Sequence, residues 1–155
     1  MDKFSLKRIF GLGTQQRGDR RSKPRALPPG GTTLLVVDDS KTVVFSLKKM
    51  LEQNGYHILV AENGENAVEL AKSAIPDLIF MDVIMPGMNG FRATRILNRE
   101  PETSHIPIVI MSGDEQSMQS FWLKQIGAVD YLAKPFKRSA IFQTLEQHLK
   151  VSRVA

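Results

Sequence analysis

Five side chains that suit phosphate chemistry stand at or next to the carboxyl ends of short apolar runs in this sequence: Asp38, Asp39, Asp82, Ser112 and Lys134. Each run has the length and composition of a buried strand. Because ligands of an open parallel sheet bind at the carboxyl ends of its strands, we expect these side chains to converge there. The pattern predicts one site with three carboxylates, a hydroxyl and an ammonium group.

The three carboxylates suggest the chemistry. Like charges at close range raise one another's pKa values unless a cation neutralises them. Mg²⁺ characteristically binds one or two carboxylates, waters and a phosphate oxygen. With the metal bound, Asp82 would stay ionised and act as a nucleophile toward a phosphoryl donor. Lys134 would stabilise the charge that develops on the phosphoryl oxygens, and Ser112 would donate a hydrogen bond to one of them.

Each of these residues also has a plainer interpretation. Asp38 or Asp39 alone is explained as well by helix capping. Ser112 before a glycine is typical of a turn, and Lys134 would ordinarily be a solvated surface lysine. Asp82 is the exception, because an acid within an apolar stretch is costly without a partner. The joint position of all five at the ends of four strands favours a common site.

The elements that must position these residues alternate regularly. We expect strands over 34–37, 58–61, 78–81, 108–111 and 129–133, each followed by a helical pattern. Ser40 is the expected N-cap of the first helix, and Asp114 or Glu115 opens the fourth. Short connections between alternating strands and helices require right-handed crossovers and a parallel sheet covered on both faces. The predicted fold class is α/β, a doubly wound five-stranded sheet of (βα)5 type.

The basic character of the chain lies at its amino terminus. Residues 1–31 carry eight Lys and Arg against two Asp, a net charge of +6, which leaves −1 for the rest of a chain whose total is +5. Glycine, proline and few apolar residues fill 11–31, so we expect a disordered extension over 1–32. A folded domain over 33–151 and a short tail over 152–155 complete the expected organisation. A short basic helix in the first ten residues, docking on a membrane surface, is the alternative.

The remaining composition excludes several classes of protein. There is no cysteine, which excludes disulfides, thiolate metal sites and cysteine nucleophiles. No apolar run approaches the roughly 18 residues of a membrane span, and the amino terminus has no compact apolar region of a secretory signal. We therefore expect a cytoplasmic protein.

Four segments resemble the receiver domain of two-component response regulators. They are Val36-Val37-Asp38-Asp39-Ser40, the run from Met81 to Gly90, Met111-Ser112-Gly113, and Asp130-Tyr131-Leu132-Ala133-Lys134-Pro135-Phe136. The resemblance covers residues 33–151. It implies the strand order 2-1-3-4-5, as in the chemotaxis receiver, and a cis peptide bond before Pro135.

The resemblance also implies a role for each site residue. The acid that matches Asp82 is phosphorylated by a histidine kinase. The acid matching Asp39 binds Mg²⁺ directly, the one matching Asp38 assists through water, and the backbone carbonyl matching Ile84 completes the protein ligands. The expected metal set is therefore Asp38, Asp39, Asp82 and Ile84.

A switch follows from the same resemblance. In receivers the hydroxyl matching Ser112 moves toward the phosphoryl group, and the aromatic residue matching Tyr131 turns inward. The face made by the fourth helix, the fifth strand and the fifth helix is thereby remodelled for a protein partner. Within the family the chain is similar to stand-alone regulators of type IV pilus twitching motility. We expect no DNA-binding or enzymatic output domain after 151, and therefore action through protein contact or as a phosphate sink.

Two other classes stay open on the sequence. Haloacid-dehalogenase-type phosphatases also combine an Asp nucleophile with Ser or Thr, Lys and Mg²⁺, but they place two acids as Asp-x-Asp after the first strand. Here Asp38 and Asp39 are adjacent and Asp82 stands alone. Binding of nucleic acid would use residues 1–31, and its affinity would fall steeply with salt. Otherwise the chain is expected to be a phosphoacceptor rather than an enzyme.

Overall fold

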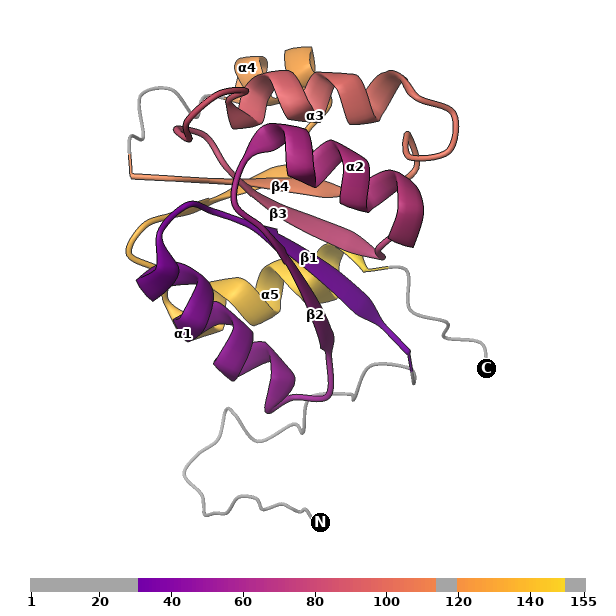
Figure 1. Ribbon diagram of the computed structural model, residues 1–155. Coiled ribbons are helices and arrows are strands. Elements are labelled where there is room, and N and C mark those ends of the chain that lie inside the picture. The colour runs from indigo at the N-terminus through magenta and orange to yellow at the C-terminus, as the bar shows by residue number, and fades with distance from the viewer. Residues whose placement is uncertain (1–30, 114–119, 150–155) are drawn as a thin grey trace, which may run out of the picture.

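The computed structural model describes residues 31–113 and 120–149 (Figure 1). Its strands and helices alternate as expected: β1 Thr33–Val37, α1 Lys41–Glu52, β2 His57–Ala61, α2 Gly64–Ala74, β3 Leu78–Asp82, α3 Gly90–Arg99, β4 Ile108–Ser112, α4 Ser120–Ile126, β5 Asp130–Ala133 and α5 Arg138–His148. All strand pairs are parallel, and the order is β2-β1-β3-β4-β5. The predicted fold class and strand order are both confirmed.

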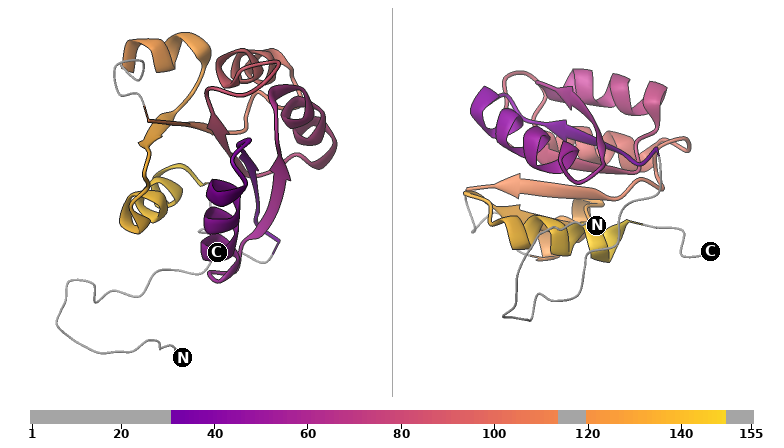
Figure 2. Two further views of the ribbon diagram at one scale, coloured as in Figure 1. Left: turned by 60° about the vertical axis from the view of Figure 1, so that its left-hand side comes forward. Right: turned by 90° about the horizontal axis from the view of Figure 1, so that it is seen from below.

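The sheet is covered on both faces (Figures 1 and 2). One face packs against α2, α3 and α4 through a cluster that includes Leu35, Ile79 and Ile110. The other face packs against α1 and α5 through residues such as Leu34 and Phe80. Neighbouring strand residues alternate between the two clusters because side chains in a strand point to opposite faces. The central strands β3 and β4 are buried throughout, which explains their continuously apolar sequences.

Three helices begin with the same side-chain cap. The side-chain oxygens of Ser40, Asn63 and Asn89 each accept a hydrogen bond from the backbone N–H three residues later. Such a cap contributes about 1 kcal/mol by satisfying an amide that the helix itself cannot pair. The prediction for Ser40 is confirmed, whereas the caps at Asn63 and Asn89 were not predicted. All three caps lie at the carboxyl ends of strands and fix where the next helix starts.

The observed boundaries differ slightly from the expected ones. Asp82 and Ser112 are the last residues of β3 and β4, and β5 starts at Asp130 rather than at 129. The opening of the fourth helix at Asp114 or Glu115 lies outside the described residues, as does the tail over 152–155. Of the predicted extension over 1–32, only Gly31 and Thr32 are described. The Thr32 carbonyl accepts a hydrogen bond from the His57 amide, so pairing with β2 begins one residue before the expected domain start.

No helix in the described ranges is both long enough and apolar enough to cross a membrane.

Candidate functional site

The five residues singled out in the sequence meet at the carboxyl edge of the sheet. They line a cleft of about 370 Å³ together with residues of the neighbouring loops: Asp38, Asp39, Ser40, Asp82, Val83, Ile84, Ser112, Gly113 and Lys134. Asp82 and Ser112 are the last residues of β3 and β4. Asp38 and Asp39 directly follow β1, and Lys134 directly follows β5. Convergence follows from the parallel register, which places the last residues of β3 and β4 side by side, with Asp82 opposite Met111.

Lys134 joins two acids that come from different strands. Its Nζ lies 2.8 Å from Asp38 Oδ2 and 3.0 Å from Asp82 Oδ1. The Asp38 side chain is 1% exposed and that of Asp82 is 9% exposed. Buried carboxylates need such partners, because desolvation makes an unpaired charge costly. The lysine therefore holds the two acids at the bottom of the cleft.

Backbone hydrogen bonds set the positions of these side chains. The Asp38 amide donates to the Ala61 carbonyl at 3.2 Å, which extends the pairing of β1 with β2 up to the site. The Lys134 amide donates to the Ser112 carbonyl at 2.9 Å, so β4 and β5 carry the hydroxyl and the ammonium group to the same edge. The peptide bond between Lys134 and Pro135 is cis, as expected.

Among the described residues that line the cleft, one ammonium group faces three carboxyl groups. Burial raises the pKa of Asp82 above its ordinary value, and the neighbouring Asp38 raises it further, although the hydrogen bond from Lys134 opposes both effects. Burial by itself would lower the pKa of Lys134, but its hydrogen bonds to Asp38 and Asp82 outweigh burial and raise it. The ionised form of Asp82 is therefore the costly one, and an additional cation would relieve that cost.

The acidic side chains could hold such a cation. One carboxylate oxygen from each of Asp38, Asp39 and Asp82 lies within 4.8 Å of the others. Mg²⁺ binds oxygen at about 2.0–2.1 Å in an octahedron, so two ligands on opposite sides are roughly 4 Å apart. The observed spread fits direct binding by one or two of the acids and a water-mediated contact to the rest. Hard carboxylate oxygens are also the donors that Mg²⁺ prefers.

Asp39 is the acid best placed to turn toward a cation. It is exposed, and among the described residues its carboxylate makes no hydrogen bond or ion pair. Asp38 differs, because Oδ1 already accepts the Ser40 amide at 2.9 Å and Oδ2 accepts Lys134. The Asp39 carboxylate could therefore bind a metal ion directly, whereas both oxygens of Asp38 already accept hydrogen bonds.

Of the three remaining candidate residues, Ser112 and Ile84 line the cleft, whereas Tyr131 is not among its lining residues. Ser112 is buried at the end of β4. Ile84 follows β3 in the loop that leads to α3, lines the cleft, and is 79% exposed. Tyr131 lies opposite Ile110 in the β4–β5 register, is half-buried, and packs against the core cluster on the α2–α3–α4 face. Because Tyr131 belongs to β5, it is also part of the face formed by α4, β5 and α5.

Two residues that support the cleft were not identified from the sequence. A Cβ at Gly90 would overlap the Asp82 carbonyl, so only glycine allows α3 to start against the end of β3. Glu65, at the start of α2, accepts the Met88 amide with Oε2 at 3.2 Å and supports the loop before α3. The Asn89-Gly90 pair could have indicated a tight turn at Gly90. The contact of Glu65 could not be read from the sequence, because it depends on the tertiary fold.

The bridging role of Lys134 gives the first prediction. Lys134→Met should lower the free energy of unfolding by about 2–3 kcal/mol, because Asp38 and Asp82 would lose their buried counter-charge. Urea denaturation at neutral pH in the presence of a chelator measures the effect. Lys137→Met is the matched control, since this lysine is exposed, and it should change stability by less than about 0.5 kcal/mol. Equal stability of the two variants would contradict the bridge.

Comparison with known proteins identifies a common family. A family model described as the response regulator receiver domain matches residues 34–146. Protein PilH of Pseudomonas aeruginosa is 45% identical over 112 residues, which cover 72% of this chain and 93% of that protein. The match favours a receiver over the phosphatase alternative.

Other relatives are longer proteins. The transcriptional regulatory protein YvrH of Bacillus subtilis is 34% identical over 119 residues, 76% of this chain but 49% of YvrH. The histidine kinase P4 of Formosa agariphila is 36% identical over 124 residues, and the chain spans only 9% of it. Apart from PilH, these relatives therefore match over half of their length or less.

Solved structures show the same fold. The Vibrio cholerae chemotaxis protein CheY4 has a TM-score of 0.72 and 29% identity, covering 76% of this chain and 98% of that one. The receiver domain of the sensor histidine kinase PA1611 from Pseudomonas aeruginosa has a TM-score of 0.71 and 29% identity, covering 77% of this chain and 98% of its own. That receiver was solved with a magnesium ion coordinated in its active site cleft.

Proposed function

The chain belongs to the response regulator receiver domain family, and we propose that it signals by accepting a phosphoryl group on Asp82. The main support is the environment of that carboxylate. Asp82 is buried at a strand end, is bonded to Lys134 at 3.0 Å, and lies within 4.8 Å of the two other acids. A buried acid that opens onto a cleft and has a cationic partner is suited to nucleophilic chemistry.

The transfer uses Asp82 as the nucleophile. One of its carboxylate oxygens forms a bond to phosphorus, while the bond from phosphorus to the donor breaks. With a phosphohistidine of a kinase as donor, the electron pair of the broken P–N bond stays on the imidazole, which takes up a proton. Lys134 can then pair with a phosphoryl oxygen from its place between β5 and the two acids, and Ser112 can donate to another.

Mg²⁺ is the proposed cofactor, and it would neutralise charge on the carboxylates and on the phosphoryl oxygens. Asp39 would hold it directly, with Asp82 and the backbone carbonyl of Ile84 as the other protein ligands. Asp38 would act through water, because both of its oxygens are engaged. The donor set and spacing described above support this arrangement.

The output is a change of surface. Phosphorylation adds a charged group with three acceptor oxygens next to Ser112. Movement of that hydroxyl and an inward turn of Tyr131 would shift the population of conformations of the α4–β5–α5 face. Tyr131 already packs against the core cluster that contains residues of α3 and α4, so the two regions are in contact before the switch.

The biological setting of this switch is also a proposal. We expect a cytoplasmic regulator that receives phosphate from a histidine kinase and acts on a protein partner. The similarity to PilH over nearly its whole length supports a role related to type IV pili and twitching motility. In this role the chain is a phosphoacceptor that catalyses its own phosphotransfer, and not a hydrolase.

Reaction with a small phosphodonor tests this function. Acetyl phosphate and Mg²⁺ should add one phosphoryl group to the protein, detected by intact mass. Excess chelator should suppress the gain in mass. Without Mg²⁺, the negative charge of the three carboxylates repels the negatively charged phosphoryl group of the donor. A gain of the same extent with chelator would show that the acidic cleft is not required.

A further inference from the structure

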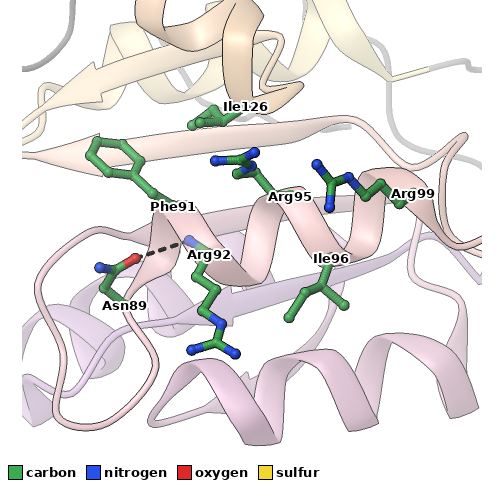
Figure 3. Close-up of a pocket in the computed structure, with 7 residues that line it drawn as sticks. All are labelled: Asn89, Phe91, Arg92, Arg95, Ile96, Arg99 and Ile126. Atoms are coloured by element: carbon green, nitrogen blue, oxygen red, sulfur yellow. Dashed lines mark hydrogen bonds between the residues drawn. The ribbon is translucent and has the colours of Figure 1, made fainter.

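A second cleft runs along α3 and shares no lining residue with the Asp82 cleft (Figure 3). It has a volume of about 740 Å³. Its lining combines three arginines with three apolar side chains: Arg92, Arg95, Arg99, Phe91, Ile96 and Ile126. Asn89, the N-cap of α3, closes one end. We call this surface the α3 groove.

The charges of the α3 groove have no acidic partner among the described residues. Arg92, Arg95 and Arg99 are exposed, and no ion pair joins any of them to an acid in the described ranges. Helix α3 contains no acidic residue. The next acid, Glu100, is paired with Lys72 at 3.8 Å. Residues 32–155 carry a net charge of only −1, so a helix with three cations that lack an ion pair in the described part of the chain stands out.

Stability alone does not favour this arrangement. Like charges three or four residues apart on a helix destabilise it slightly, and Arg92–Arg95 and Arg95–Arg99 have these spacings. The apolar lining residues are less exposed: Phe91 and Ile96 are half-buried and Ile126 is buried. Cations next to apolar side chains suit a ligand that has both acidic and apolar groups.

The placement of the guanidinium groups indicates the type of ligand. Figure 3 shows Arg95 and Arg99 on the side of α3 toward Ile126, while Arg92 and Ile96 lie on the side toward α2. With a rise of 1.5 Å per residue, Arg92 and Arg99 are roughly 10 Å apart along the helix. A phosphate group needs donors that converge on one point. Charges spread along a helix instead match carboxylates spread along a polypeptide.

We propose that the α3 groove binds an acidic, amphipathic polypeptide segment of a partner protein. Its carboxylates would pair with the three arginines, and its apolar side chains would cover Phe91, Ile96 and Ile126. Arginine suits this role because its planar group binds a carboxylate with two parallel hydrogen bonds. The interaction is separate from phosphate transfer, since none of these residues lines the Asp82 cleft.

Fluorescence anisotropy with the full-length protein tests the proposal. The probe is a labelled 16-residue helical peptide, with glutamates spaced three and four residues apart beside leucines. The triple variant Arg92→Gln, Arg95→Gln, Arg99→Gln should bind this peptide at least about tenfold more weakly than wild type. Because these side chains are exposed and form no ion pair within residues 31–113 and 120–149, the variant should keep its thermal stability.

The control must lose the same charge elsewhere, because residues 1–31 are basic and attract acidic peptides. Lys48→Gln, Lys49→Gln, Lys137→Gln removes three exposed cations from α1 and from the turn before α5. This control should change the affinity by less than about twofold. Equal weakening in both triple variants, or equal binding of a scrambled peptide, would overturn the proposal. So would displacement of the peptide by pyrophosphate at matched concentration, which would indicate a phosphate site.

Discussion

Asp82→Asn should gain no phosphoryl group from acetyl phosphate under conditions in which wild type gains one. The amide that replaces the carboxylate has no anionic oxygen to attack phosphorus. Fold loss is not an alternative explanation, because burial already disfavours the ionised Asp82 and a neutral side chain of the same shape removes that cost. Intact mass measures the gain, and circular dichroism confirms that the variant is folded.

The same strand supplies a matched control. Asp77 precedes β3 at its other end, and its Oδ2 accepts the Thr33 amide at 2.8 Å. Asp77→Asn makes the same chemical change far from the cleft and should react like wild type. If Asp82→Asn gained a phosphoryl group as readily as Asp77→Asn, the nucleophile would be another residue, with Asp38 and Asp39 as the first candidates.

Asp39→Asn should weaken Mg²⁺ binding by at least about tenfold, since even groups that only orient a metal ligand contribute 10- to 100-fold. The reason is that this carboxylate has no competing hydrogen bond or ion pair among the described residues. Asp39 is exposed and has no partner in the described part of the chain, whereas both oxygens of Asp38 are engaged. Isothermal titration of the protein with Mg²⁺ at fixed ionic strength gives the dissociation constant.

Glu62→Gln is the control for net charge. Glu62 is an exposed acid that follows β2 at the same edge of the sheet, but it is not part of the acidic group. Its substitution should change the Mg²⁺ affinity by less than about twofold, because exposed charges are strongly screened. An equal loss in Asp39→Asn and Glu62→Gln would mean that Mg²⁺ responds to the general charge of the edge and has no defined ligand at Asp39.

Much of the fold was predictable because the central strands are buried on both faces. Runs such as Leu78–Met81 are continuously apolar for that reason, and their ends could be located to within a residue. The start of the edge strand β5 was harder to predict. Val129 has a residue type common in strands, but it is exposed and precedes β5, and only its amide joins the sheet by donating to the Ile108 carbonyl. The helix cap at Ser40 follows from local chemistry, which a sequence shows directly.

The sequence was enough to predict which residues meet at the candidate site, but not which hydrogen bonds join them. Parallel topology brings Asp38, Asp82 and Lys134 to one edge, and that follows from the order of elements. That Lys134 bridges both acids depends on side-chain geometry across β1, β3 and β5. The α3 groove could not be predicted either, because the exposure of its arginines depends on how α3 lies between α2 and α4 (Figure 1).

The central claim is that the phosphoryl group resides on Asp82, and locating it chemically is the most direct test. Borohydride reduces an aspartyl phosphate to homoserine, which remains in the peptide chain and is identified by fragmentation in a mass spectrometer. After reaction with acetyl phosphate and Mg²⁺, reduction should place homoserine at position 82 and leave positions 38 and 39 as aspartate. Homoserine at either of those positions, or none at 82 in a protein that has gained the phosphoryl mass, would contradict the claim.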